Sequence, residues 1–173
     1  MRAAIAFLVL VSSAFCQDGN SSMETAVPSL RLQVRTSSTH LRMTDKIVVT
    51  IFFRSPEKDI TIWNALGWGP AAGLHLQISD ASGREVQNDF VEMHHPLPPD
   101  RTGKSALITI GGEIFAGFDS QIPAETLFPG PGRYTIKCLY HPRLPRGYFH
   151  GYTIWGSEDG PIESTGVSVL VER

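Results

Sequence analysis

The sequence predicts an all-β protein, a two-sheet antiparallel sandwich of about seven to nine strands. Short segments alternate apolar and polar residues with a period of two, as a strand with one buried face requires. The chain of 173 residues contains 16 glycines and 12 prolines. These breakers recur about every eight to twelve residues, a spacing typical of sandwiches. No segment keeps the 3.6-residue apolar period of an amphipathic helix.

Residues 1–16 have the three parts of a secretory signal peptide. Arg2 supplies positive charge, residues 3–11 form an apolar run, and residues 12–16 provide small side chains for cleavage before Gln17 or before Phe15. The run is too short to cross a bilayer, which takes about twenty residues, and no later segment is apolar enough to cross a membrane. We therefore expect a secreted, periplasmic or cell-envelope protein without a transmembrane span. The alternative is that the run is an apolar first strand of the fold.

Cys16 allows a second interpretation of the leader, lipoprotein processing. Ser13-Ala14-Phe15 resembles a bacterial lipobox, although Phe15 stands where a small residue is preferred. Acylation would then make Cys16 the first mature residue and a lipid anchor. Cleavage before Gln17 would instead leave Cys138 as the single cysteine, which excludes an internal disulfide. Because Cys138 lies in an apolar strand, we expect a buried, unreactive thiol.

After the leader, the chain divides into a short polar segment and one domain. Residues 17–28 are polar and are predicted to be a flexible mature N-terminus, and residues 29–173 form the domain. The expected strands, in order, are 30–35, 46–54, 60–62, 74–79, 84–90, 105–110, 114–118, 133–140 and 166–171.

Turn residues separate these strands. Residues 80–83 (Asp-Ala-Ser-Gly) are expected to turn the chain so that residues 84–90 return as the second arm of a hairpin. Residues 93–104 contain three prolines and are expected to be a loop. Gly111-Gly112 is expected to be a bend or bulge between two strands.

The segment Leu127-Phe-Pro-Gly-Pro-Gly-Arg-Tyr134-Thr-Ile136 carries a family resemblance. Immunoglobulin-like and fibronectin-III-like domains enter their penultimate strand through such a Pro-Gly turn, followed by Tyr and alternating apolar residues. The closing segment 153–171 looks like the last hairpin of bacterial extracytoplasmic domains of this type. The resemblance implies an immunoglobulin-like sandwich in which Tyr134 is the tyrosine corner. It implies no function, and the paired Cys-Trp-Cys core of antibody domains is absent.

Charge and motifs argue against several activities. The net charge of −2, with scattered basic residues, argues against a nucleic-acid partner. The six histidines form no HExxH or Cys/His zinc spacing, and neighbouring His94 and His95 are expected to be solvated loop residues. There is no Gly-x-Ser-x-Gly elbow or P-loop, and Glu158-Asp159 is expected to be a solvated turn. We therefore predict a protein that is not an enzyme and needs neither cofactor nor metal.

Aromatic residues in predicted loops are the candidate binding residues. Loops of a sandwich gather at its two ends, where aromatic side chains can stack on sugars or anchor a protein partner. The alternative is that some of them, Trp63 and Trp155 above all, cap the core beneath long loops. The candidates are Trp63, Trp68, Tyr148, Phe149, Tyr152 and Trp155.

Three functions are compatible with these observations. The first is an extracytoplasmic binding or adhesion module whose partner is a protein or a glycan. The second is a protease inhibitor that inserts loops into a cleft; small immunoglobulin-like inhibitors of cysteine proteases use three loops, and residues 67–69, 111–112 and 145–148 occupy comparable places. The third is a structural accessory domain of a cell-envelope assembly. We favour the binding module.

Overall fold

The computed structural model describes residues 30–56, 58–64, 67–68, 73–87, 106–111 and 116–173, and they form an all-β protein. The predicted leader, its Cys16 and the segment 17–28 lie outside the described residues, as do residues 88–105. None of the described helices is long and apolar enough to span a membrane.

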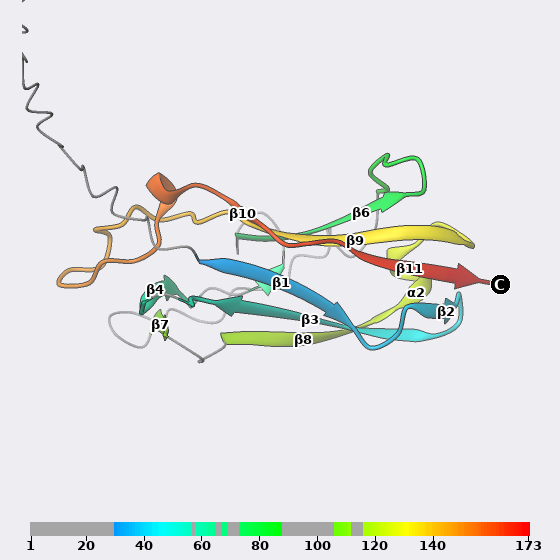
Figure 1. The fold of residues 1–173 in the computed structure, drawn as a ribbon, viewed down its shortest axis with the longest axis horizontal. Coiled ribbons are helices and arrows are strands. Elements are labelled where there is room, and N and C mark those ends of the chain that lie inside the picture. The colour runs from blue at the N-terminus through cyan, green and yellow to red at the C-terminus, as the bar shows by residue number, and fades with distance from the viewer. Residues whose placement is uncertain (1–29, 57, 65–66, 69–72, 88–105, 112–115) are drawn as a thin grey trace, which may run out of the picture.

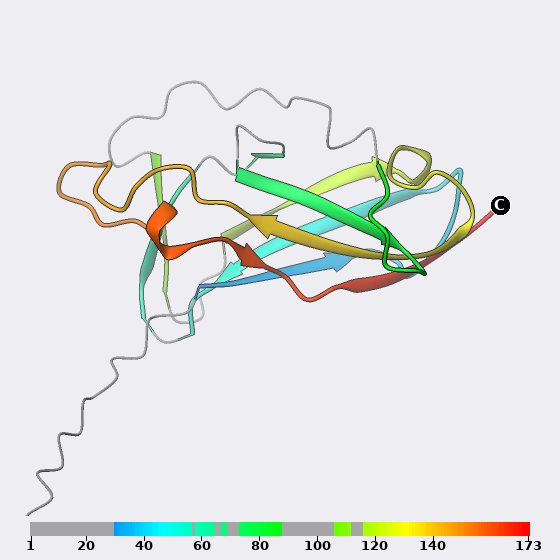
Figure 2. The same cartoon turned by 90° about the horizontal axis from the view of Figure 1, so that it is seen from above.

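Two main sheets form two layers (Figure 1). The first has the order β1-β3-β8 and the second the order β2-β11-β9-β6-β5, with β10 also paired to β9. A separate pair, β4-β7, lies at one end of the molecule (Figures 1 and 2). The first sheet contains β1 (Arg31–Thr36), β3 (Lys46–Arg54) and β8 (Ala116–Pro123). The second contains β2 (His40–Arg42), β5 (Gly67–Trp68), β6 (Gly73–Asp80), β9 (Gly132–Tyr140), β10 (Ile162–Glu163) and β11 (Val167–Glu172), and the end pair is β4 (Ile60–Trp63) and β7 (Leu107–Ile110).

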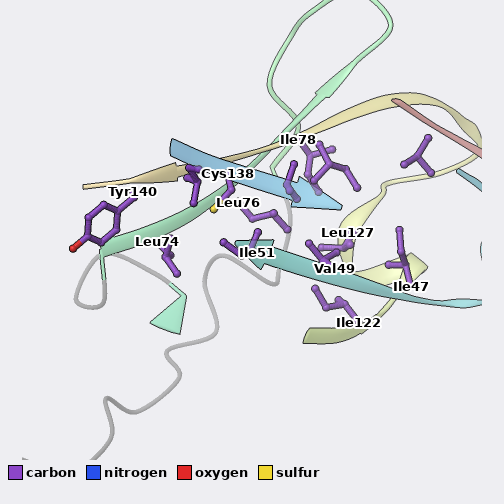
Figure 3. Packing of buried hydrophobic residues seen from close by; sticks show 14 of the residues in the cluster. Ile47, Val49, Ile51, Leu74, Leu76, Ile78, Ile122, Leu127, Cys138 and Tyr140 are labelled. Atoms are coloured by element: carbon purple, nitrogen blue, oxygen red, sulfur yellow. The ribbon is translucent and has the colours of Figure 1, made fainter. Parts of the chain in front are cut away.

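The core lies between the two main sheets, as Figure 3 shows. The alternation of side chains along each strand produces this core, because every second side chain points to the same face of the sheet. On β3 the residues from Ile47 to Phe53 alternate between buried and half-buried, and β9 alternates in the same way from Tyr134 to Tyr140. The ring of Phe53 meets that of Tyr140 edge to face across the layers, with centroids 5.1 Å apart. The hydrophobic effect of this shared core holds the two layers together.

The predicted antiparallel arrangement describes six of the eight strand pairs among the described residues, and the other two pairs are parallel. β2 runs parallel to β11, and β5 runs parallel to β6. The first exception follows from the path of the chain: after β1 it crosses from one sheet to the other over residues 37–39 without reversing. β2 therefore keeps the direction of β1, which is also the direction of β11 (Figure 1).

Two short helices lie within the described part of the chain: α2 (Ala124–Leu127) connects β8 to β9, and η2 (Ser157–Asp159) precedes β10. The expected turn at residues 80–83 is present. Gly83 N–H donates to Asp80 O at 2.9 Å, and Val86 N–H donates to Ile78 O at 2.7 Å, which starts the return of the hairpin.

Candidate functional site

The loop between β9 and β10, residues 141–161, carries most of the aromatic candidates; we call it the recognition loop. It projects beyond the sheets at the end of the molecule that holds β4 and β7 (Figures 1 and 2). Its outer part, residues 147–153, is here called the tip. Tyr148 is 60% exposed and Tyr152 42%, and they are the large hydrophobic side chains exposed within the described part of the chain.

Main-chain hydrogen bonds join the two arms of the recognition loop. Ile154 N–H donates to Arg146 O at 3.1 Å, and Ser157 N–H donates to Leu144 O at 2.9 Å. Tyr148 N–H donates to Pro145 O at the start of the tip, and Tyr152 N–H donates to Phe149 O within it, each at 3.0 Å. These hydrogen bonds order the backbone along the length of the loop and not only at its two ends.

Trp155 anchors the base of the loop to the body of the protein. Its backbone N–H donates to Thr61 O of β4 at 2.7 Å, its indole N–H donates to Gly160 O at 3.4 Å, and its half-buried side chain packs against the core. The neighbouring Ile154 is 3% exposed. Trp155 therefore caps the core beneath a long loop, which was the alternative to a binding role.

The other candidates divide between tip and sheet. Phe149 is half-buried and packs edge to face against Tyr148, with ring centroids 5.1 Å apart. Trp63 is half-buried on β4, opposite Leu107. Trp68 lies on β5 opposite Leu74, and its side chain is outside the described residues. Tyr148, Phe149, Tyr152 and Trp155 therefore share one loop, and Trp63 belongs to the strand to which that loop is bonded.

An ion pair inside the recognition loop was not identified from the sequence. Arg146 Nε donates to both carboxylate oxygens of Asp159, at 3.1 and 3.0 Å, and Nη2 also contacts this carboxylate. The interpretation of Glu158-Asp159 as a solvated turn is wrong for Asp159, whose side chain is 9% exposed. The partners lie 13 residues apart, so no helical or strand spacing signals the pairing.

The electrostatic surroundings of the ion pair favour its charged form. Burial acts to raise the pKa of Asp159, but hydrogen bonds from Arg146 and the Gly156 N–H, with the guanidinium charge, outweigh it and lower this pKa below its ordinary value. The same carboxylate raises the pKa of Arg146, chiefly through the hydrogen bond. Both groups are therefore ionised at neutral pH.

Two residues outside the loop have structural positions. Tyr134 Oη donates to Gly130 O at 2.9 Å, and its ring packs on Phe128, which is the contact expected of a tyrosine corner. Burial, followed by the negative charge of Asp80, raises the pKa of Tyr134. Cys138 is fully buried, and burial raises the pKa of its thiol to about 12. At neutral pH this thiol is protonated, and the thiolate is the reactive form.

A shallow, open depression lies away from the recognition loop, on β2, β9 and β11. Its volume is about 580 Å³, and its lining includes His40, Arg133, Thr135 and Ser168. His40 Nε2 lies 3.4 Å from Glu172 Oε1, and both side chains are well exposed. Among the described residues, no three His, Cys, Asp or Glu side chains gather as a metal site would require. Both polar and apolar residues line the depression, and they include no converging set of reactive groups, so the recognition loop is the stronger candidate.

No protein-family model, no curated protein and no solved structure matches the chain.

Proposed function

We propose that this protein is an exported, non-enzymatic binding module with an immunoglobulin-like sandwich, and that the recognition loop is its binding surface. One observation carries the proposal: the exposed large hydrophobic residues of the described chain, Tyr148 and Tyr152, lie together on one projecting loop. Tyrosine offers a large contact area with few rotatable bonds and a polar end, which makes it common in binding surfaces.

The order of the strands supports the immunoglobulin-like part of the proposal. Domains of this type place strands A, B and E in one sheet and strands C, F and G in the other. Here β1-β3-β8 follow the order A-B-E, and β11-β9-β6 follow the order G-F-C. Tyr134 stands near the start of β9, the counterpart of strand F, where a tyrosine corner belongs. The recognition loop is then the F–G loop, which carries binding residues in antibody variable domains.

The leader supports export. Residues 1–16 combine Arg2, an apolar run and small residues in the order of a signal peptide. We propose that the mature chain begins at Gln17 and acts outside the cytoplasm, with lipidation at Cys16 as the alternative form of attachment.

A pull-down from host envelope and culture fractions tests the binding surface. The bait is the mature protein, compared with a Tyr148→Ala/Tyr152→Ala variant. The control is a His40→Ala/Arg133→Ala variant, which alters the depression on the second sheet. We expect the bait and the control to capture the same partner and the tip variant to lose it. A partner retained by all three would place the interface elsewhere and contradict the proposal.

Protease inhibition is the second candidate function, because the recognition loop projects from the end of the sandwich as a cleft-filling loop would (Figure 1). Inhibition constants against a panel of cysteine and serine proteases test it. Loss of inhibition in the tip variant would favour this function. Complete inactivity of the wild-type protein at micromolar concentration would rule it out for the panel.

A further inference from the structure

We propose that Arg146 and Asp159 are positioning residues of the recognition loop: their ion pair holds the tip as a rigid protrusion that inserts into a concave site on a protein partner. The inference rests on the proposed function and deepens it. It names the pair that presents the exposed tyrosines, and it names the kind of partner that the tip fits.

The Asp159 carboxylate joins both arms of the loop at one point. It accepts hydrogen bonds from Arg146 Nε on the outgoing arm, at 3.1 and 3.0 Å, and from the Gly156 N–H on the returning arm, at 2.8 Å. A guanidinium that binds both oxygens of a carboxylate fixes orientation as well as distance. One carboxylate therefore sets the separation of the arms and the direction in which the tip leaves them.

Neighbouring groups restrict the same junction. The Glu158 side chain accepts the backbone N–H of Arg146 at 3.0 Å. A Cβ atom on Gly156 would lie 2.4 Å from Arg146 N, so the two arms approach more closely than any larger residue would allow. Asp159 is 9% exposed and the Arg146 side chain is 51% exposed, so the carboxylate side of the pair lies against the protein while the guanidinium side faces water.

This arrangement favours binding because it orders the tip before a partner arrives. Fixing a loop and its side chains at the moment of binding costs free energy, and a loop already held in one shape avoids much of that cost. The tip carries its exposed side chains directly beyond the ion pair, since Gly147 and Tyr148 follow Arg146 in the chain. A change in the angle of the arms would therefore displace both tyrosines together.

The shape of the tip favours a protein partner over a glycan. The rings of Tyr148 and Phe149 meet at an interplanar angle of 78°, so they do not form the common flat surface on which sugar rings stack. The tip projects from the end of the molecule (Figures 1 and 2). The long projecting loops of nanobodies, which belong to a class of binding loops rich in tyrosine and glycine, insert into concave protein surfaces, and the tip holds Gly147 and Gly151 beside its tyrosines.

Limited digestion with chymotrypsin tests the ion pair without any partner. Chymotrypsin cleaves after Tyr and Phe, and cleavage of a folded protein follows the population of locally opened states. We expect Arg146→Ala to speed cleavage after Tyr148, Phe149 and Tyr152 at least tenfold, measured by mass spectrometry of the products. Arg146→Lys keeps the charge but loses the fork geometry, so its cleavage rate is expected to lie between those of the wild type and Arg146→Ala. Arg133→Ala, which lies far from the loop, is expected to be cleaved at the wild-type rate. A thermal melt shows whether each variant remains folded.

A crosslinking experiment tests the partner. The variant Tyr148→p-benzoylphenylalanine is irradiated with envelope and culture fractions, and the crosslinked protein is identified, purified and titrated. We expect Arg146→Ala to raise the dissociation constant at least tenfold and Arg133→Ala to leave it within threefold.

The two experiments separate the possible failures. Equal cleavage of wild type and Arg146→Ala would overturn the positioning role of the ion pair, whatever the pull-down shows. Faster cleavage with an unchanged dissociation constant would overturn that role while leaving the recognition loop as the binding surface. Failure to crosslink a protein, or binding to a glycan array that Tyr148→Ala abolishes, would overturn the protein partner.

Discussion

Tyr134 joins the turn before β9 to the strand itself through a single hydroxyl. The hydroxyl donates to Gly130 O at 2.9 Å, and the ring lies against Phe128 at a centroid distance of 4.8 Å. This contact could be predicted from the sequence because all of its parts lie within one short segment, where a Pro-Gly turn leads into an alternating strand. The motif can therefore be recognised without knowing how the sheets are arranged.

Tyr134→Phe is expected to lower the free energy of unfolding by about 0.5–1.5 kcal/mol, because the ring stays in place while one hydrogen bond is lost. Urea unfolding followed by circular dichroism measures the change. Tyr152→Phe is the control, since the Tyr152 side chain is exposed at the tip, and it should leave stability unchanged. Equal stability of both variants and the wild type would contradict a stabilising corner.

Asp159 makes the shape of the recognition loop dependent on pH. Its pKa in the folded protein lies below the ordinary value of 3.8, so the ionised carboxylate stabilises the fold. That contribution is complete above the ordinary pKa and is lost as pH falls through the lower folded pKa. Trp155 lies in the same loop and donates its indole N–H to Gly160 O.

We therefore expect Trp155 fluorescence to be constant from pH 7 down to about pH 4, the region of the ordinary carboxyl pKa, and to change only at lower pH, because the pKa of Asp159 is lowered in the folded protein. Asp159→Asn should show the acid-form signal already at pH 7. Because Trp63 and Trp68 also fluoresce, both are replaced by Phe in this experiment. A wild-type signal that stays constant down to pH 2 would argue against the carboxylate as the titrating group.

At the scale of elements, the close approach of the two loop arms depends on Gly156, which has no side chain. Gly156→Ala would place its Cβ atom 2.4 Å from Arg146 N and 2.8 Å from Pro145 C, both backbone atoms that cannot turn away. A Cβ atom on Gly147, in the same loop, would meet nothing within 4 Å beyond its own chain neighbours. The two glycines therefore form a matched pair.

Gly156→Ala is expected to separate the arms and to expose the tip to chymotrypsin, whereas Gly147→Ala should behave like the wild type. Forcing a methyl group into a close-packed site costs about 1–3 kcal/mol, so part of the effect is expected in a thermal melt as well. Identical cleavage rates for the two variants would contradict a close approach of the arms.

Strands with strong alternation could be predicted from the sequence, and weakly patterned elements could not. The expected strands at 46–54, 74–79, 133–140 and 166–171 correspond to β3, β6, β9 and β11. β8 extends to Pro123, but its residues Asp119, Ser120 and Gln121 are polar and gave no apolar face. α2 is a single helical turn, too short for a 3.6-residue period to be recognised.

In the candidate site, too, features with a local sequence signal could be predicted and features that depend on distant contacts could not. Aromatic composition in a Gly- and Pro-rich segment indicated the recognition loop, because that signal is local. The Arg146–Asp159 ion pair was missed because it joins two polar residues whose pairing depends on the return of the chain. The two-residue strands β5 and β10 and the parallel pairing of β2 with β11 were missed for the same reason: each depends on which distant segment lies alongside.

At the scale of the whole molecule, one core is shared by both sheets. Ile51 of β3 is fully buried, as is Cys138 of β9, and Figure 3 shows both in the space between the layers. A cavity left by truncating a buried side chain of one sheet therefore weakens the packing of the other sheet as well. The two sheets should then unfold together.

Ile51→Ala is expected to lower the free energy of unfolding by about 2–5 kcal/mol and to speed labelling of Cys138 by a thiol reagent, although Cys138 lies on the opposite sheet. Mass spectrometry of the labelled peptide measures this rate. Thr50→Ala, at the adjacent half-buried position of the same strand, should change neither quantity much. Loss of stability without faster labelling would indicate that the sheets open independently.

The pairing of β3 with β8 has a consequence for the time course of folding. β3 (Lys46–Arg54) finds its partner at Ala116–Pro123, so that sheet closes only when segments more than sixty residues apart meet. Domains dominated by such distant pairings fold over milliseconds to seconds rather than microseconds. Under the proposed export, this delay would keep the strands separate while translocation proceeds. The same delay leaves β3, with its run Ile-Val-Val-Thr-Ile-Phe-Phe, open to other chains, so the yield of refolding should fall as the protein concentration rises.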